Sequence, residues 1–146
     1  MNMREALPGS GIEAKTAGLR ARIEQRLAEL TPGDPAPAKL ADAMRYCLLA
    51  PGKRARAILA ILTTVHCGGT VEDGLTGACA LEMVHASSLI LDDLPVMDDA
   101  SLRRGKPTCH LVYGQATAML AAISLMNRAF AIASSDSRLP SDRRVE

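Results

Sequence analysis

The segment LILDDLPVMDDASLRRGKPTCH (residues 89–110) combines acidic and basic side chains in a pattern suited to binding a metal ion and an anion. Its residues Asp92, Asp93, Asp98 and Asp99 place four carboxylates within eight positions. Carboxylates this close together repel one another, so the pattern favours a bound cation over a role in packing. Because the candidate ligands are all oxygen atoms, the expected ion is Mg²⁺, which usually takes further ligands from water and substrate phosphates.

Pro95 predicts how two of these carboxylates meet. Asp98 follows Asp92 by six residues, which is the wrong interval for one straight helical face. Since proline cannot continue the hydrogen-bond ladder of a helix, the chain must bend after Asp92. We expect this bend to bring Asp98 back toward Asp92, so that both carboxylates can reach one ion.

Two basic segments can supply the cationic half of such a site. Arg103, Arg104 and Lys106 follow the acids and offer guanidinium forks and a point charge to phosphate oxygens. A second group lies in the sequence PGKRAR, where Lys53 and Arg56 are three residues apart and therefore share one side of a helix. The free N–H groups at a helix start also favour anions. Two cationic groups beside one acidic site predict two phosphorylated substrates.

Each of these segments also has an ordinary structural interpretation. An acidic loop is usually solvated, GKRAR alone is more often a solvated helix start, and a histidine such as His85 on a helix face is usually a hydrogen-bonded core residue. The combination favours a site, because an acid pair, a prolyl bend, a second acid pair and a double arginine occur within 22 residues.

Helices must position these residues, because apolar side chains recur at helical spacing and the alternating pattern of strands is absent. Prolines and glycines separate the periodic segments. The expected helices cover residues 12–30, 38–50, 53–67, 75–93 and 108–133. The predicted fold class is all-α, an antiparallel helical bundle, and its third helix is expected to be buried because it is apolar on most faces.

Composition argues against several classes of protein. The 146 residues suit a single domain, in which residues 1–11 are expected to form a flexible tail. A net charge of +1 and an aromatic content of 2% argue against nucleic-acid binding. The four cysteines form no CxxC motif and the N-terminus has no apolar signal core. The stretch AMLAAISLMNRAFAIA is predicted to be too short and too interrupted for a membrane span, so a cytoplasmic protein is expected.

GKRAR, EMVHASSLILDDLPVMDD and LRRGKPTCH together resemble the trans-isoprenyl diphosphate synthase (polyprenyl synthetase) family, and most closely its bacterial geranylgeranyl diphosphate synthases. The resemblance extends from residue 38 to the C-terminus. It implies an all-α fold of the isoprenoid synthase type and a Mg²⁺-dependent enzyme that is usually a homodimer. The implied reaction condenses isopentenyl diphosphate with an allylic diphosphate.

The resemblance also implies roles for individual residues. Asp92 and Asp98 would hold Mg²⁺ against the allylic diphosphate, with Asp93 and Asp99 in support, and Arg103 would contact that diphosphate. The expected catalytic set is Asp92, Asp93, Asp98 and Arg103. The residues expected to bind isopentenyl diphosphate are Lys53, Arg56, His85 and Arg104.

Ser87 and Ser88 are expected to set the product length, because the growing chain would run down an apolar tunnel whose floor lies just before Asp92. Farnesyl-producing relatives commonly carry an aromatic ring at the position of Ser87. Helical geometry favours Ser88 for contact, since it lies almost directly beneath Asp92. Because both side chains are small, the floor of the tunnel should lie deep enough for a C20 chain. The expected product is therefore geranylgeranyl diphosphate and not farnesyl diphosphate.

The family also has a second aspartate-rich motif, whereas this chain has no Asp-Asp pair after Asp99. The chain therefore resembles the N-terminal part of a single polyprenyl synthetase domain, and by itself it is expected to be inactive. Two functions remain open. The first is a prenyltransferase, or a piece of one. The second is a non-catalytic relative that binds a diphosphate, or that pairs with a complete synthase as a regulatory subunit. The expected assembly is a homodimer or a pair with a complete synthase.

Overall fold

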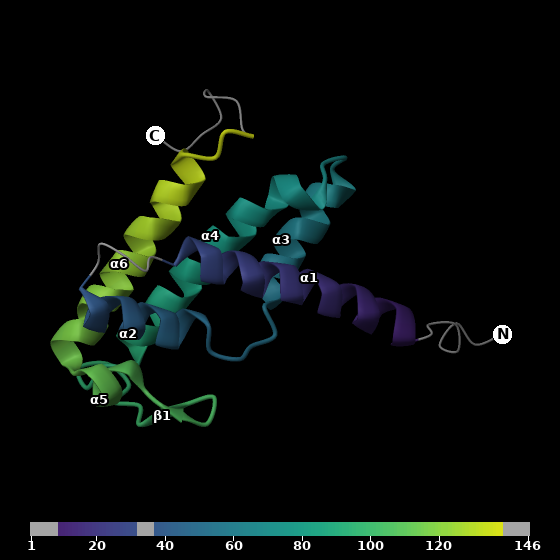
Figure 1. Ribbon diagram of the computed structural model, residues 1–146. Helices are drawn as coiled ribbons and strands as arrows, with labels where there is room; N and C mark the ends of the chain where they lie inside the picture. The colour runs from purple at the N-terminus through teal and green to yellow at the C-terminus, as the bar shows by residue number, and fades with distance from the viewer. Residues whose placement is uncertain (1–8, 32–36, 139–146) are drawn as a thin grey trace.

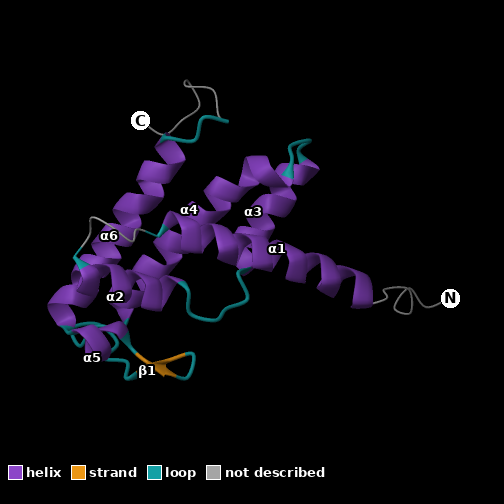
Figure 2. Cartoon of the chain, in the orientation of Figure 1, coloured by secondary structure: helices purple, strands orange, loops and turns teal. Residues whose placement is uncertain are grey.

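The computed structural model describes residues 9–31 and 37–138, which are mostly helical (Figures 1 and 2). The helices are α1 (Gly9–Leu30), α2 (Ala38–Leu48), α3 (Ala55–His66), α4 (Val71–Asp92), α5 (Cys109–Tyr113) and α6 (Gln115–Ser134). Two short strands, β1 (Leu102–Arg103) and β2 (Lys106–Pro107), form an antiparallel hairpin. The predicted all-α fold class is confirmed. The tail expected over residues 1–11 stays a prediction for residues 1–8, which lie outside the described part of the chain, whereas residues 9–11 belong to α1.

Helix α4 is the centre of the bundle. It runs antiparallel to α3 and to α6, and α1 crosses it (Figure 1). Its most extensive contacts are with α6 and then with α3. Small side chains let these helices approach closely, and those buried on α4 and α6 include Ala78, Ala86, Ala118, Ala121 and Ala122. The close packing holds the C-terminal end of α4 in one place, which is where the acidic segment begins.

The start of α4 differs from the prediction by one turn. The helix begins at Val71 and not near residue 75, because Thr70 and Asp73 form a capping box. The Asp73 amide donates to Thr70 Oγ1 at 3.3 Å, and the Thr70 amide donates to Asp73 Oδ2 at 2.8 Å. These two bonds satisfy backbone donors that the first turn leaves unpaired.

The prediction of one helix over residues 108–133 is wrong. Gly114 has φ 88° and ψ 154°, a conformation that ends α5 and requires glycine, and α6 then starts at Gln115. The hairpin was not expected either. Each strand has only two residues, too few for an alternating pattern to appear in the sequence.

Helix α3 is not buried as expected. Only Ala57 and Ile61 on its inner side are buried, whereas Leu59, Leu62 and Val65 are exposed. The sequence pattern shows that a helix is apolar on most faces but does not show how many of those faces another element covers. Apolar side chains are exposed on α4 and α6 as well, namely Leu81, Val84, Met119, Leu120, Ile123 and Phe130.

Two helices within the described residues, α4 and α6, are long and apolar enough to cross a membrane by length and composition alone. The prediction that residues 118–133 are too short for a span is therefore wrong on length, because α6 has 20 residues. Length and composition are weak evidence, since a buried core helix passes the same test, and 56% of the apolar window of α4 is buried.

Candidate functional site

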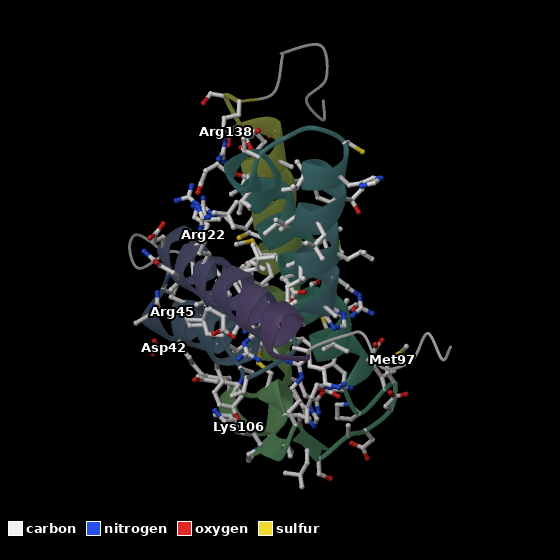
Figure 3. The ribbon with its side chains drawn as sticks, turned by 90° about the vertical axis from the view of Figure 1, so that its right-hand side faces the viewer. Arg22, Asp42, Arg45, Met97, Lys106 and Arg138 are labelled. Carbon is white, nitrogen blue, oxygen red and sulfur yellow. The ribbon has the colours of Figure 1, made fainter. Side chains whose placement is uncertain are left out.

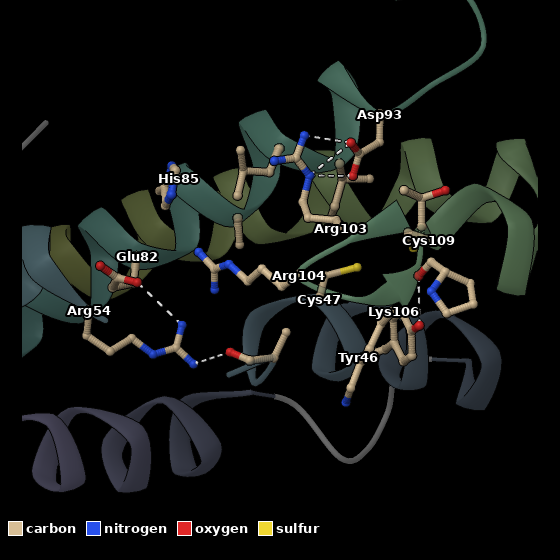
Figure 4. A pocket seen from close by; sticks show the side chains of 16 residues that line it. Tyr46, Cys47, Arg54, Glu82, His85, Asp93, Arg103, Arg104, Lys106 and Cys109 are labelled. Atoms are coloured by element: carbon tan, nitrogen blue, oxygen red, sulfur yellow. Dashed lines mark hydrogen bonds and ion pairs between the residues drawn. The ribbon is translucent and has the colours of Figure 1, made fainter. Parts of the chain in front are cut away.

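The predicted acidic and basic segments meet at one end of the molecule. Met97 of the acidic loop and Lys106 of the hairpin lie at this end, and Arg138 lies at the opposite end (Figure 3). A cavity of about 60 Å³ lies between α2, α4 and the hairpin. The charged side chains that line it are Arg54, Glu82, His85, Asp93, Arg103, Arg104 and Lys106 (Figure 4).

The acidic loop folds back as Pro95 predicts. Helix α4 ends at Asp92, and the Asp98 amide donates to the Asp92 carbonyl oxygen at 2.9 Å. The Asp99 amide donates to the Leu94 carbonyl oxygen at 3.1 Å, and Asp99 has φ 48°, a left-handed conformation that aspartate tolerates better than most residues. The predicted bend between Asp92 and Asp98 is therefore confirmed for the backbone.

The acidic loop can supply part of the ligand shell of Mg²⁺, but it does not enclose the ion. Among residues 9–31 and 37–138, no group of three or more His, Cys, Asp or Glu side chains is placed to hold a metal ion. Asp92 is half-buried and Asp98 is exposed, so both carboxylates can reach a ligand from solvent. Mg²⁺ is commonly held by one or two carboxylates, with water and substrate phosphates completing the shell.

Asp93 pairs with Arg103. The Asp93 carboxylate is 3% exposed and accepts two bonds from Arg103 Nε, at 2.9 and 2.8 Å, and one from Arg103 Nη2, at 2.7 Å. These charge-assisted bonds fix the plane of the guanidinium at the cavity wall (Figure 4) and raise the pKa of Arg103. Metal support by Asp93 and diphosphate contact by Arg103 stay predictions, but this pairing was not predicted.

The hairpin turn positions Arg104. Arg104 and Gly105 are its two turn residues, and their φ values of 52° and 77° are both positive, as a type I′ turn requires. Arg104 Nη1 donates to the Pro51 carbonyl oxygen at 2.9 Å. Gly52 permits this contact, because a Cβ there would lie 2.4 Å from Arg104 Nη1. The hairpin thereby contacts residues 51–56, called the PGKRAR loop below, of which residues 51–54 precede α3 and the last two form the start of that helix.

His85 and Arg56 also come together. Arg56 Nη1 lies 3.3 Å from His85 Nε2. Burial and then the charge of Arg56 lower the pKa of His85, which favours the neutral ring. Lys53 is exposed and lines a separate groove between α1 and α3, not the cavity. The four residues predicted to bind isopentenyl diphosphate therefore lie around the PGKRAR loop and the hairpin, with Lys53 to one side.

Two charged residues at the site are absent from the sequence-based prediction. Arg54 and Glu82 are 6% and 5% exposed, and Arg54 Nη1 lies 3.4 Å from Glu82 Oε2 (Figure 4). Charged residues are almost never buried unless they are paired. The available signal was the position of Glu82, one helical turn before His85 on the same face of α4.

Ser87 and Ser88 do not line the cavity. Ser87 is fully buried and its Oγ has no hydrogen-bond partner, while half-buried Ser88 donates to the His85 carbonyl oxygen at 2.9 Å. The α4 residues that do line the cavity are Glu82, His85, Ala86, Leu89 and Ile90, and Asp93 lines it directly after the helix. A role of Ser87 or Ser88 in product length stays a prediction.

Comparison with known proteins gives a consistent result. The family model for polyprenyl synthetase matches residues 37–143. The geranylgeranyl diphosphate synthase of Pantoea ananas is 52% identical over 116 residues, which are 78% of this chain and 38% of that protein. A protein of Arabidopsis thaliana named heterodimeric geranylgeranyl pyrophosphate synthase large subunit 2 is 50% identical over 94 residues, covering 64% of this chain and 25% of that protein.

Solved structures show the same similarity. The crystal structure of an FPP/GFPP synthase from Zymomonas mobilis matches with a TM-score of 0.82 and 35% sequence identity. The match covers 87% of this chain and 46% of that one. The chain therefore spans less than half the length of each of these three relatives.

Proposed function

Because the chain belongs to the polyprenyl synthetase family, we propose that it provides the diphosphate-binding part of a prenyltransferase site. The reaction is the condensation of isopentenyl diphosphate with an allylic diphosphate to give geranylgeranyl diphosphate. The observation that carries the proposal is one cavity lined by Asp93 after α4, by Arg103 and Arg104 of the hairpin and by Arg54 of the PGKRAR loop, with Arg104 hydrogen-bonded to Pro51. These elements come from separate parts of the chain.

In this proposal each residue binds either the metal ion or one of the two diphosphates. Asp92 and Asp98 would hold Mg²⁺, which when bound neutralises negative charge on a departing pyrophosphate. Arg103 contacts the allylic diphosphate. The isopentenyl diphosphate is held by Lys53, Arg56, His85 and Arg104.

The chemistry needs strong anion binding and little water. The allylic C–O bond breaks and its electron pair leaves with pyrophosphate, while the double bond of isopentenyl diphosphate attacks the allylic carbon and a proton is lost. Guanidinium groups fixed before the reaction stabilise the charge on the leaving group. Aliphatic surroundings protect the cationic carbon from water, which agrees with an aromatic content of only 2%.

The proposal predicts Mg²⁺-dependent binding of an allylic diphosphate to the 146-residue chain. We expect Mg²⁺ to increase the affinity by about tenfold, equivalent to 1.4 kcal/mol, because Asp92 and Asp98 supply oxygen ligands to an ion that also contacts the phosphates. Asp92→Ala should remove this dependence, whereas Asp42→Ala, at an exposed position on α2, should retain it. Isothermal titration calorimetry with and without Mg²⁺ measures both. Equal affinities in wild type would contradict the proposed metal site.

A second function is a non-catalytic partner of a complete synthase. A relative named as the large subunit of a heterodimeric synthase favours it. An assay with a complete synthase separates the two functions. Under either function the chain alone, with Mg²⁺ and both diphosphates, is expected to form no prenyl product longer than the allylic substrate. Only the partner function requires that adding the chain change the products of a complete synthase.

A further inference from the structure

We propose that Glu82 is a positioning residue, which anchors Arg54 and thereby fixes the loop that presents Lys53 and Arg56 to a diphosphate. The inference rests on the proposed diphosphate-binding function. Glu82 itself would touch no substrate. Its effect would reach the bound anion through Arg54 and the backbone of the PGKRAR loop.

The side chain of Arg54 is hydrogen-bonded to Glu82 and Ala50, whereas its buried Nε has an acidic neighbour but no hydrogen-bond partner among the described residues. Its Nη1 lies 3.4 Å from Glu82 Oε2, its Nη2 donates to the Ala50 carbonyl oxygen at 2.9 Å, and its Nε lies 3.6 Å from Glu24 Oε1. Glu24 is 43% exposed at its side chain, whereas Glu82 is 5% exposed. Glu82 is thus the buried partner of a buried cation, and removal of either charge alone would leave the other uncompensated.

The backbone of Arg54 explains why this anchor matters. Arg54 has φ 51° and ψ 32°, and it immediately precedes α3. A non-glycine residue keeps this left-handed conformation only when its surroundings determine it strongly. The Ile58 amide donates to the Arg54 carbonyl oxygen at 2.9 Å, so Arg54 also accepts the first hydrogen bond of α3. The position of Arg54 therefore sets where Lys53 ends the loop and where Arg56 projects from the helix.

Helix α4 contacts the PGKRAR loop through two side chains. Glu82 and His85 are one turn apart on α4, and they contact Arg54 and Arg56 respectively. The contact between Glu82 and Arg54 is buried, whereas the contact between His85 and Arg56 is exposed. Arg104 holds the other end of the loop through the Pro51 carbonyl. The buried pair thus fixes the side of the loop that the hairpin does not hold.

The decisive variant is Arg54→Met combined with Glu82→Leu. Replacing a buried ion pair by apolar side chains of similar size is often neutral or stabilising, so the fold should persist. The double substitution removes one positive and one negative charge, so net charge does not change. Inorganic pyrophosphate without Mg²⁺ is the probe, because it reports on the cationic residues and not on the acidic loop. We expect its affinity, measured by calorimetry, to fall about tenfold, with helical content and Tm unchanged.

Two further variants separate positioning from stability. Glu82→Gln keeps the shape and one acceptor for Arg54 but removes the charge, so it should lower Tm while retaining an affinity close to that of wild type. The matched control is Arg26→Gln with Glu29→Gln, which removes an exposed ion pair of 2.9 Å on α1 and should change neither property.

Arg56→Ala distinguishes failure of this inference from failure of the proposed function. If Arg56→Ala weakens pyrophosphate binding and the Arg54→Met, Glu82→Leu variant binds as tightly as wild type, the positioning role of Glu82 is wrong and the proposed function stands. If the wild-type chain does not bind pyrophosphate, or if Arg56→Ala binds it equally well, both are overturned.

Discussion

Gly52 determines how closely Arg104 approaches the PGKRAR loop. A Cβ at this position would lie 2.4 Å from Arg104 Nη1 and 3.1 Å from its Cζ, so the guanidinium would have to move. Because that group is the far end of a flexible side chain, we expect Gly52→Ala to change the free energy of unfolding by no more than about 0.5 kcal/mol. Pyrophosphate affinity should fall by roughly the same factor as in Arg104→Ala, since the guanidinium is displaced in one variant and absent in the other.

Calorimetry and thermal unfolding measure the two effects. Gly77→Ala is a suitable control, because no atom lies within 4 Å of a Cβ at Gly77, and its affinity should equal that of wild type. If Gly52→Ala bound pyrophosphate normally, the contact of Arg104 with Pro51 would have no importance for the anion.

His85 links stability to pH. Burial and the neighbouring Arg56 lower its pKa in the folded chain, below the ordinary value of 6.5. As pH falls through 6.5, the unfolded chain takes up a proton that folded His85 does not yet accept. The stabilising contribution is therefore complete above pH 6.5 and is lost progressively between 6.5 and the lower folded pKa.

Denaturant unfolding at pH 7.5, 6.5 and 5.5 measures this effect. We expect the free energy of unfolding of the wild-type chain to decrease from pH 7.5 to 5.5. The free energy of unfolding of the His85→Gln variant should decrease less over the same interval. Substitution of exposed His66 by Gln serves as the control, and its free energy of unfolding should depend on pH as that of the wild-type chain does. Identical slopes for His85→Gln and wild type would show that His85 titrates alike in both states.

At the scale of secondary structure, Gly114 separates two helices that the sequence pattern joins. Its φ of 88° and ψ of 154° are accessible essentially only to glycine, so Gly114→Ala should lower the free energy of unfolding by about 1–3 kcal/mol. Gly77→Ala within α4 should raise it by about 0.5–1 kcal/mol, because alanine favours a helix interior. Urea unfolding followed by circular dichroism compares them. A Gly114→Ala variant as stable as wild type would contradict this role for Gly114.

The helices were predictable from sequence because apolar spacing reports directly on which residues face a core. Their ends were less predictable, since Thr70 caps α4 through its side chain and Gly114 ends α5 through its backbone conformation, and apolar spacing contains neither. Burial of α3 was misjudged for a related reason. Periodicity identifies an apolar face, but coverage of Leu59 and Leu62 depends on elements elsewhere in the chain.

The sequence pattern identifies the predicted site residues as charged groups and assigns each of them to a ligand. The structure brings Arg56 to His85 and Arg104 to the Pro51 carbonyl, whereas Lys53 lines a separate groove. The assignment of these residues to ligands stays a prediction. The ion pairs were not predictable in the same way. Asp93 and Arg103 are ten residues apart and Arg54 and Glu82 are 28 apart, so only the folded chain shows that they satisfy one another.

At the scale of the whole molecule, α6 presents an apolar stripe. Leu120, Ile123 and Phe130 are 55%, 49% and 56% exposed and recur at helical spacing. An exposed stripe of this kind favours association, so we expect the chain to form dimers whose population rises with concentration. A homodimer stays a prediction until this is measured.

Sedimentation velocity over a range of concentrations tests the expectation. Leu120→Glu combined with Ile123→Glu should shift the chain toward monomer, because charged side chains would lose hydration at the contact. The same substitution at Leu59 and Leu62 on α3 provides a matched control that should leave the distribution unchanged. Association that persists in the α6 variant and disappears in the α3 variant would place the contact on α3.

The pairing of Asp93 with Arg103 has a consequence for what must move when an anion binds. The three charge-assisted bonds occupy Nε and Nη2 of Arg103 and leave Nη1 outside the pair. An anion can therefore contact Arg103 through Nη1 while Asp93 still holds the guanidinium, and no exchange of partners is needed. Because the donor is already oriented, capture and placement become a single step, and the observed binding rate should rise in proportion to ligand concentration.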